Sequence, residues 1–363
     1  MAYTTIDDPT QYFDTTLWTG SGGARTISGL NHKPDLIWTK TRSVGYNHMW
    51  SDSSRGFNAN SELGSNSTAA EGGLSAETYG YKSGHTADGW TMVDGTDSVD
   101  NQEDGNTNQP SVTYVGWTWA ANGGTTTTND ASSTGVGNVD SVYQANTTAG
   151  FSIVTFDLTS DSGDKTIAHG LGVAPKVIIF KNRDAATNWA IYHHTQTPPK
   201  YLTFTTDPVY SSDDFNNSTA PTSTVFSLAT SWHGANKHVA YCFAEKQGYS
   251  KFGSYTGNGN DDGPFVYTGF KPAWLMLKRT DNARPWFMFD NKRNPSNVMK
   301  IRLKADSSAA DDTSNDNRID FLSNGFKIRD DALEMAADGG TYIYMAFAES
   351  PFVSSEGVPT TAR

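Results

Sequence analysis

One pattern occurs three times along this chain, and this repetition constrains the fold more than any other feature of the sequence. In each copy a proline is followed by mostly apolar residues and, six positions later, by a lysine. Eight positions past the lysine stands a histidine or tryptophan, and twelve positions past it an aspartate or histidine. The copies read Pro34, Lys40, His48 and Asp52; then Pro175, Lys181, Trp189 and His193; then Pro272, Lys278, Trp286 and Asp290.

A second marker closes each copy. It consists of a β-branched residue, an aromatic residue four positions later, and then alanine. The three closing runs are residues 115–120, 239–244 and 343–348. Markers that recur in the same order indicate three copies of one structural unit.

The markers divide the chain into segments. We place the units at residues 10–123, 149–247 and 248–352, with a polar linker at 124–148 and a C-terminal tail at 353–363. The second and third units are contiguous, so we expect them to be tightly coupled. The small and polar linker predicts that the first unit is set apart from them.

Short apolar runs, often alternating and bounded by Gly, Asn, Asp, Ser and Thr, predict β-strands throughout. Several strands in about 100 residues favour an antiparallel β-sandwich, jelly-roll or lectin-like, so we predict an all-β chain of three tandem sandwich units. The prolines fit strand starts, and the lysines are expected at strand ends with their ammonium groups in water. A β-propeller is the alternative, but three blades are too few to close a ring.

Composition narrows the range of partners. Charged residues make up 18% of the 363 residues, aromatic residues 12%, and the formal net charge is −12. This balance argues against coiled coils and disorder, and it repels phosphate backbones and anionic lipid, so neither nucleic acid nor membrane is an expected partner. We expect no Sec export or membrane span, because no signal-like start and no run of about 18 apolar residues occurs. With Cys242 as the single cysteine, intrachain disulfides and multi-cysteine metal sites are excluded.

The repeated lysine, together with the aspartate or histidine twelve positions later, looks most like a site. Repetition in three units suits a scaffold better than an active site, and His193 breaks any shared charge mechanism. We therefore interpret these positions as structural, with a lysine or Arg55 paired to the carboxylate across a hairpin.

Other catalytic patterns are weak. Glu245 and Glu349 follow two of the closing runs, but Ala121 takes that place in the first unit, so no repeated acid pair for glycoside hydrolysis is visible. No Gly-x-Ser-x-Gly elbow occurs, and His193 and His194, adjacent on a strand, should point to opposite faces. We predict no catalytic residue, no cofactor and no metal, and assign no binding residue.

Two further features each have two interpretations. Oxygen-rich loops at 258–263 and 94–104 could bind Ca²⁺ or could be ordinary turns. Tryptophans could form a platform that stacks on sugars, or they could belong to the core. The tryptophans concerned are Trp90, Trp117, Trp119 and Trp232.

Several longer motifs carry a resemblance. They are the start at residues 6–13, the run 33–43 (KPDLIWTKTRS), Asp52 to Gly56 (DSSRG), and the runs 150–154, 169–176, 253–259 and 321–327. With these motifs the chain resembles a domain common in structural proteins of marine tailed bacteriophages, including cyanophages. The resemblance covers nearly the whole sequence.

The resemblance implies a non-enzymatic structural component of a tailed-phage virion, in a tail fibre or an external head or tail appendage. Such a protein is made in the host cytoplasm, contacts other virion proteins and forms a homo-oligomer, a trimer in a fibre. One alternative is a carbohydrate-binding adhesin that recognises a host surface glycan. A polysaccharide depolymerase is a third.

Overall fold

The computed structural model describes residues 2–97, 105–158, 162–197, 200–209, 215–229, 234–314, 316 and 318–361. Over these residues the fold is nearly all β, with 40% in strands and 4% in helices, and contains several antiparallel sheets. The all-β prediction is confirmed. Among the described residues, no helix has both the length and the apolar character needed to cross a membrane.

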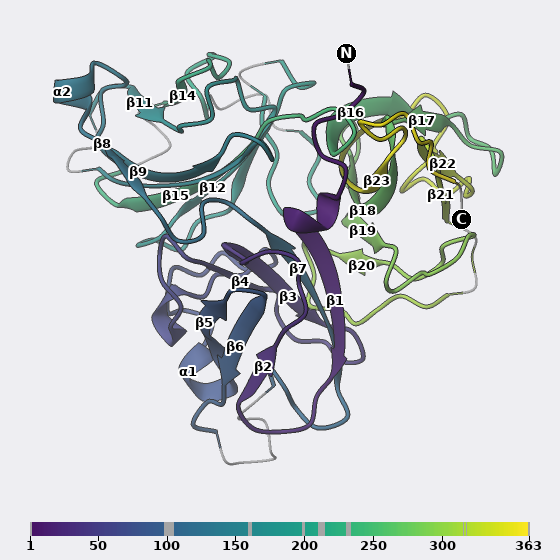
Figure 1. Ribbon diagram of the computed structural model, residues 1–363, viewed down its shortest axis with the longest axis horizontal. Coiled ribbons are helices and arrows are strands. Elements are labelled where there is room, and N and C mark those ends of the chain that lie inside the picture. The colour runs from purple at the N-terminus through teal and green to yellow at the C-terminus, as the bar shows by residue number, and fades with distance from the viewer. Residues whose placement is uncertain are drawn as a thin grey trace.

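Within the described residues, three large antiparallel sheets carry the repeated pattern in the same strand order. Figure 1 shows how these sheets are arranged. In each sheet the opening strand lies beside the closing strand, which is followed by the proline-to-lysine strand and then the strand ending in aspartate or histidine. The first sheet is β1 (Phe13–Thr19), β7 (Thr113–Trp119), β3 (Leu36–Thr41) and β4 (Met49–Asp52). The second is β10 (Phe151–Asp157), β15 (Lys237–Phe243), β12 (Val177–Asn182) and β13 (Ala190–His193). The third is β16 (Ser250–Thr256), β23 (Thr341–Pro351), β18 (Phe270–Arg279) and β19 (Trp286–Asp290), extended by β20 (Leu303–Lys304).

A small sheet packs against one face of each large sheet, and each pair of sheets encloses its own buried cluster. Trp90 and Phe326, for example, extend from small sheets into these clusters. The small sheets are β2 (Arg25–Ile27), β6 (Gly89–Val93) and β5 (Tyr81–Thr86); β11 (Lys165–Ala168) and β14 (Val225–Leu228); and β17 (Phe265–Tyr267), β22 (Gly325–Ile328) and β21 (Ile319–Leu322).

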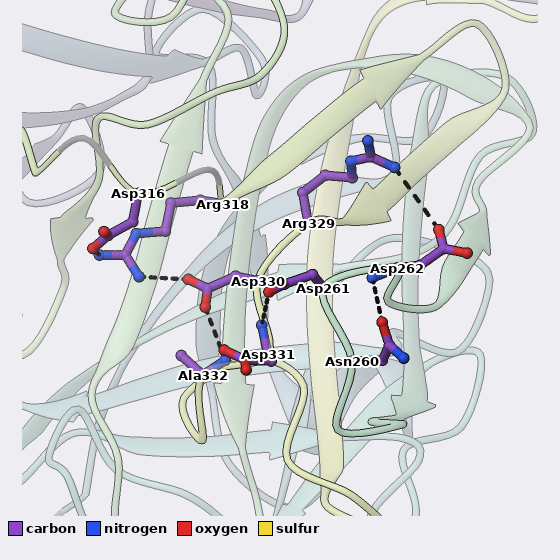
Figure 2. A pocket seen from close by; sticks show the side chains of 9 residues that line it. All are labelled: Asn260, Asp261, Asp262, Asp316, Arg318, Arg329, Asp330, Asp331 and Ala332. Atoms are coloured by element: carbon purple, nitrogen blue, oxygen red, sulfur yellow. Dashed lines mark hydrogen bonds and ion pairs between the residues drawn. The ribbon is translucent and has the colours of Figure 1, made fainter.

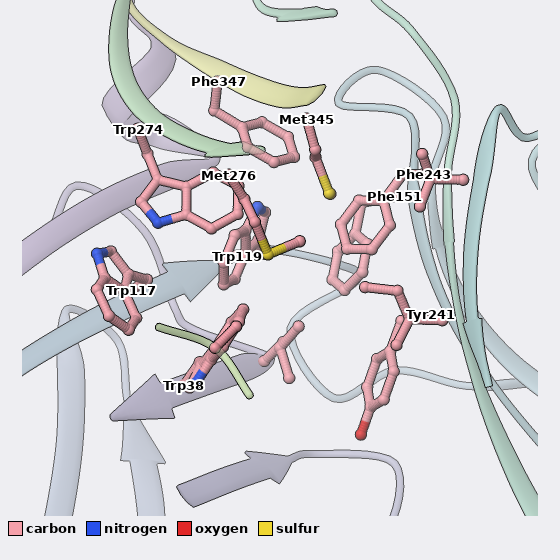
Figure 3. Packing of buried hydrophobic residues seen from close by; sticks show 14 of the residues in the cluster. Trp38, Trp117, Trp119, Phe151, Tyr241, Phe243, Trp274, Met276, Met345 and Phe347 are labelled. Atoms are coloured by element: carbon pink, nitrogen blue, oxygen red, sulfur yellow. The ribbon is translucent and has the colours of Figure 1, made fainter. Parts of the chain in front are cut away.

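The opposite faces of the three large sheets meet in one central core (Figure 3). At its centre lie Trp119, Phe243 and Phe347, the aromatic residues of the three closing markers. Their ring centroids are 5.6 to 6.3 Å apart, and each pair is arranged edge to face, the favoured geometry for aromatic pairs. The closing marker therefore recurs because all three copies meet at one point.

The segment 124–148, expected as a polar linker, is folded. It contains β8 (Thr127–Asn129), the helix α2 (Ala131–Thr134) and β9 (Ser141–Asn146). β9 pairs with β10 and β8 pairs with β9, so the segment adds two strands to the second large sheet. Thr and Val in these strands favour extended backbone, and the Asp130 side chain caps α2.

Short elements complete the fold. The helix α1 (Ala76–Tyr79) and the 3₁₀ turns η1 (Pro9–Gln11) and η2 (Ala59–Ser61) lie in loops. The expected C-terminal tail turns back on itself through an isolated bridge between Val353 and Pro359. Ser355 N donates to Asp7 Oδ1 at 2.6 Å, so the described part of this tail is fixed to the N-terminal segment.

Replacing Phe347 by alanine should lower the free energy of unfolding by about 3–5 kcal/mol, because it leaves a cavity at the point where the three large sheets meet. Phe265, which is 47% exposed on β17, provides the matched control, and its replacement by alanine should change the value by no more than about 0.5 kcal/mol. Urea unfolding followed by tryptophan fluorescence measures both. Equal losses in the two variants would show that the central core contributes no special stability.

Candidate functional site

The repeated polar residues gather where the large sheets meet one another. We refer to residues 10–123, 149–247 and 248–352 as repeats 1, 2 and 3, and to each contact region between two of them as a junction. At the position eight past the lysine, a ring N–H donates to a main-chain carbonyl of another repeat. The bonds are Trp189 Nε1 to Gly64 (2.8 Å), Trp286 Nε1 to Thr203 (2.8 Å) and His48 Nε2 to Lys304 (2.9 Å).

The position twelve past the lysine contacts the closing strand of the next repeat in all three copies. The carboxylate Oδ2 accepts a hydrogen bond where the residue is aspartate, and the histidine ring donates one to a carbonyl. The pairs are Tyr241 Oη to Asp52 (2.7 Å), Trp117 Nε1 to Asp290 (3.2 Å) and His193 Nε2 to the carbonyl of Tyr344 (3.2 Å).

A main-chain hydrogen bond completes each junction. Its acceptor is the carbonyl of the residue two past the repeated lysine. The bonds run from Glu71 N to Arg183 O (2.9 Å), from Val209 N to Thr280 O (2.9 Å) and from Asp311 N to Arg42 O (2.7 Å). Repeat 1 is therefore joined to repeat 2, repeat 2 to repeat 3, and repeat 3 back to repeat 1. The expectation that the first unit is set apart is wrong.

Arginine–acid–arginine clusters stabilise two of the junctions. Glu71 Oε1 lies 2.8 Å from both Arg55 Nη1 and Arg183 Nε. At the junction of repeats 3 and 1, Asp311 binds Arg293 (2.9 Å) and Arg42 (2.8 Å) in the same way. The predicted pairing of Arg55 with Asp52 is also present, at 2.5 Å.

The junction of repeats 2 and 3 has uncharged residues at all of the equivalent positions. Gln196 stands three past His193, where the other copies have arginine, and Thr280 and Val209 replace the second arginine and the acid. A buried carboxylate without its arginine would be strongly unfavourable. Burial lowers the pKa of His193 to about 3, so a neutral ring occupies the aspartate position.

The repeated lysines are buried, which corrects the expectation that their ammonium groups lie in water. Lys40, Lys181 and Lys278 are at most 1% exposed. Lys181 Nζ donates to the carbonyls of Thr187 (2.6 Å) and of Thr68 in repeat 1 (2.8 Å). Lys278 Nζ bonds Thr206 of repeat 2 in the same way (2.9 Å), whereas Lys40 Nζ bonds Thr41 O within its own repeat (2.8 Å).

Desolvation lowers the pKa of each repeated lysine, to about 7 for Lys40 and about 8 for Lys181 and Lys278. Each ammonium group is surrounded by main-chain carbonyls rather than by an open cavity. Such a lysine connects loops of the fold and is not placed to attack a substrate.

A surface pocket lies beside the third small sheet, formed by β17, β22 and β21 (Figure 2). Its lining combines five aspartates with Arg318 and Arg329, and most of the charge is paired. Arg318 bonds Asp316 (2.5 Å) and Asp330, and Lys327, next to the pocket, bonds Asp262 (2.7 Å). The full lining is Asn260, Asp261, Asp262, Asp316, Arg318, Arg329, Asp330, Asp331 and Ala332.

Comparison with known families gives one result. A family model described as a domain of unknown function, DUF7483, matches residues 8–351. The chain belongs to this family. The match includes every strand from β1 to β23, so the DUF7483 domain comprises the three large sheets and their junctions together. No curated protein and no solved structure matches the chain.

The candidate calcium loop at 258–263 forms turns. Asn258 Oδ1 accepts from Asn260 N (3.2 Å), and Asn260 Oδ1 accepts from Asp262 N (2.8 Å). Such side-chain to main-chain hydrogen bonds are those of ordinary turns. Of the loop at 94–104, residues 98–104 lie outside the described part. Within the described residues, no group of three His, Cys, Asp or Glu side chains is arranged to hold a metal ion.

The adjacent histidines and the two glutamates considered for catalysis lie in different surroundings. The rings of His193 and His194 stack at 5.4 Å rather than pointing to opposite faces, because β13 ends at His193. His194 Nε2 donates to the carbonyl of Phe252 (2.7 Å), while Glu245 accepts from the amide of the same residue (2.8 Å). Glu349 binds Lys271 at 2.9 Å. Neither the histidine pair nor these acids form a shared site.

The tryptophans considered for sugar stacking belong to the core where the structure describes them. Trp90, Trp117 and Trp119 are at most 2% exposed, and Trp232 lies outside the described residues. Sequence reasoning also missed Arg42 and Arg183, although a signal existed, since both stand two positions past a repeated lysine.

The buried lysines predict a pH dependence. The pKa of Lys181 is about 8 in the folded chain, whereas an unfolded lysine titrates near 10.4. At pH values between these two, Lys181 is mostly protonated in the unfolded chain and mostly neutral in the folded chain. The free energy of unfolding should therefore rise with pH from 8 to 9, with up to about 1 kcal/mol from this residue. In Lys181→Met this slope should be smaller, while Lys200→Met at an exposed site should keep it. Chemical denaturation at pH 7, 8 and 9 measures the slopes, and identical slopes in all three proteins would contradict the prediction.

Proposed function

We propose that the chain is a non-enzymatic structural module, in which three two-sheet sandwich units, one from each repeat, close into a ring. The observation that carries this proposal is the set of equivalent hydrogen bonds at the three junctions. Each unit is held by both neighbours, so no unit can leave without breaking two junctions and exposing the central core.

The use of polar residues supports a structural role. The most conspicuous polar residues of the sequence are the repeated lysines and the aspartates or histidine twelve positions on. All of them are buried, with their hydrogen-bonding atoms directed at the same or another repeat. Polar residues that join units are typical of a structural building block, because buried polar groups whose hydrogen bonds are all made specify one arrangement.

The resemblance to virion proteins of tailed bacteriophages supplies the biological setting of the proposal. We infer that the module belongs to a tail fibre or an external head or tail appendage and contacts other virion proteins. A closed module without disulfides suits a particle that must persist outside cells, because burial on both faces of every large sheet protects the backbone hydrogen bonds. Association of several copies, as a trimer in a fibre, remains a prediction of the resemblance.

Particles of a phage that encodes this chain provide the test. We expect quantitative mass spectrometry of gradient-purified particles to find the chain in several copies per particle, and antibody labelling to place it on the exterior. A replication protein of the same phage serves as the control and should be lost during purification. A chain that is abundant in the lysate but absent from purified particles would overturn the virion role.

A further inference from the structure

Two aromatic side chains lie exposed on one face of the third small sheet, which consists of β17, β22 and β21. They take part neither in the junctions nor in the core. Phe265 is 47% exposed and Tyr267 is 53% exposed, whereas Val266 between them is buried in the core of that sheet pair. Side chains two positions apart on a strand share a face, so both rings project to the same side of β17, about 7 Å apart along the strand. Among the described strands β17 pairs with β22 and forms an edge of its sheet.

Two glycines lie next to the rings. Gly325 pairs with Tyr267 across the strands, and a Cβ atom placed on it would lie 3.1 Å from Cε2 of Phe265. The same Cβ atom would lie only 2.1 Å from the carbonyl oxygen of Val266, so glycine at 325 allows β17 and β22 to pack closely beside the Phe265 ring. A Cβ atom on Gly269 would similarly lie 3.7 Å from Cε1 of Tyr267. Both rings leave aromatic surface open to solvent.

A second tyrosine fixes the position of Tyr267. The hydroxyl of Tyr3 lies 3.1 Å from that of Tyr267 and donates to the carbonyl of Gly269 at 2.8 Å. Rings held in place before binding lose little conformational entropy when a ligand stacks on them.

Charged side chains border the rings. Lys327 pairs directly with Phe265 across β17 and β22, and Asp320 of β21 stands opposite Lys327 on the far side. Arg329 lies between two carboxylates, 3.4 Å from Asp320 and 3.8 Å from Asp262 (Figure 2 shows the second pair). Two cationic and two anionic groups balance here, so the border offers hydrogen bonds without net charge.

We propose that this face of β17 and β22, with the adjoining pocket edge at Asn260 and Asp262, binds a neutral saccharide. The apolar C–H face of a pyranose ring can stack on Phe265 and Tyr267, while its hydroxyls meet the carboxylates and the guanidinium at the border. An anionic glycan fits less well, because five aspartates line the adjoining pocket against two arginines and the whole chain carries a net charge of −12. This activity goes beyond the structural role and does not depend on it.

The test is a binding measurement on the full-length protein. The probes are immobilised neutral oligosaccharides of glucose, galactose, mannose and N-acetylglucosamine, with sialylated and sulfated glycans as the anionic arm. We expect binding within the neutral set, at least a tenfold weaker affinity for Phe265→Ala and for Tyr267→Ala, and unchanged affinity for Val173→Ala, an exposed apolar site in repeat 2. Circular dichroism and urea unfolding verify that each variant is folded.

Several outcomes would overturn the proposal. They are binding to no neutral glycan, binding confined to the anionic arm, and full affinity in a folded Phe265→Ala and Tyr267→Ala double variant. A fourth is self-association in analytical ultracentrifugation that both substitutions abolish, since it would assign the face to a second copy of the chain. The mass-spectrometric test on phage particles is unaffected by any of these results, so the two proposals fail independently.

Discussion

The contact on which the rest of the structure depends is the meeting of Trp119, Phe243 and Phe347 in the central core. Each of these residues comes from the closing strand of a different large sheet, and that strand lies in the interior of its sheet. Because the three rings share one site, the position of each sheet is fixed by the other two. The junctions then set the rotation of each sheet, through bonds that recur at equivalent residues.

The junctions also explain which differences between the copies are tolerated. Two of them use partly buried ion clusters around Glu71 and Asp311, and the third uses neutral groups around His193. A mixed set, with an aspartate at 193 and no arginine at 196, would leave a buried charge without a partner. A junction can therefore use either the full set of charged groups or the full set of neutral groups. The main-chain hydrogen bond that all three junctions share keeps their geometry alike.

Much of the fold could be predicted from local sequence. The markers that begin at Pro34, Pro175 and Pro272 lead to strands in equivalent places, because strand pattern and closing aromatics are local features. Continuous apolar runs such as residues 177–180 also indicate strands that are buried on both faces of their sheet. The burial of Lys181 could not be predicted in this way, since the carbonyl of Thr68 that accepts a hydrogen bond from its ammonium group comes from another repeat. The pairing of segment 124–148 with β10 was missed for a different reason, because strands rich in Ser and Thr resemble polar linkers in sequence. The aromatic face of β17 was missed because the exposure of Phe265 and Tyr267 follows from the place of β17 at a sheet edge, which local sequence does not give.

Native-state hydrogen exchange tests the closed ring most directly. The inner amides of β7, β15 and β23 belong to three different sheets, and a ring whose parts support one another must open them together. We expect the slowest amides of the three strands to exchange with one common free energy, equal to that of global unfolding. If one strand instead exchanged at a free energy lower by about 2 kcal/mol or more, its sheet would open alone, and the three repeats would be neighbours rather than a single closed unit.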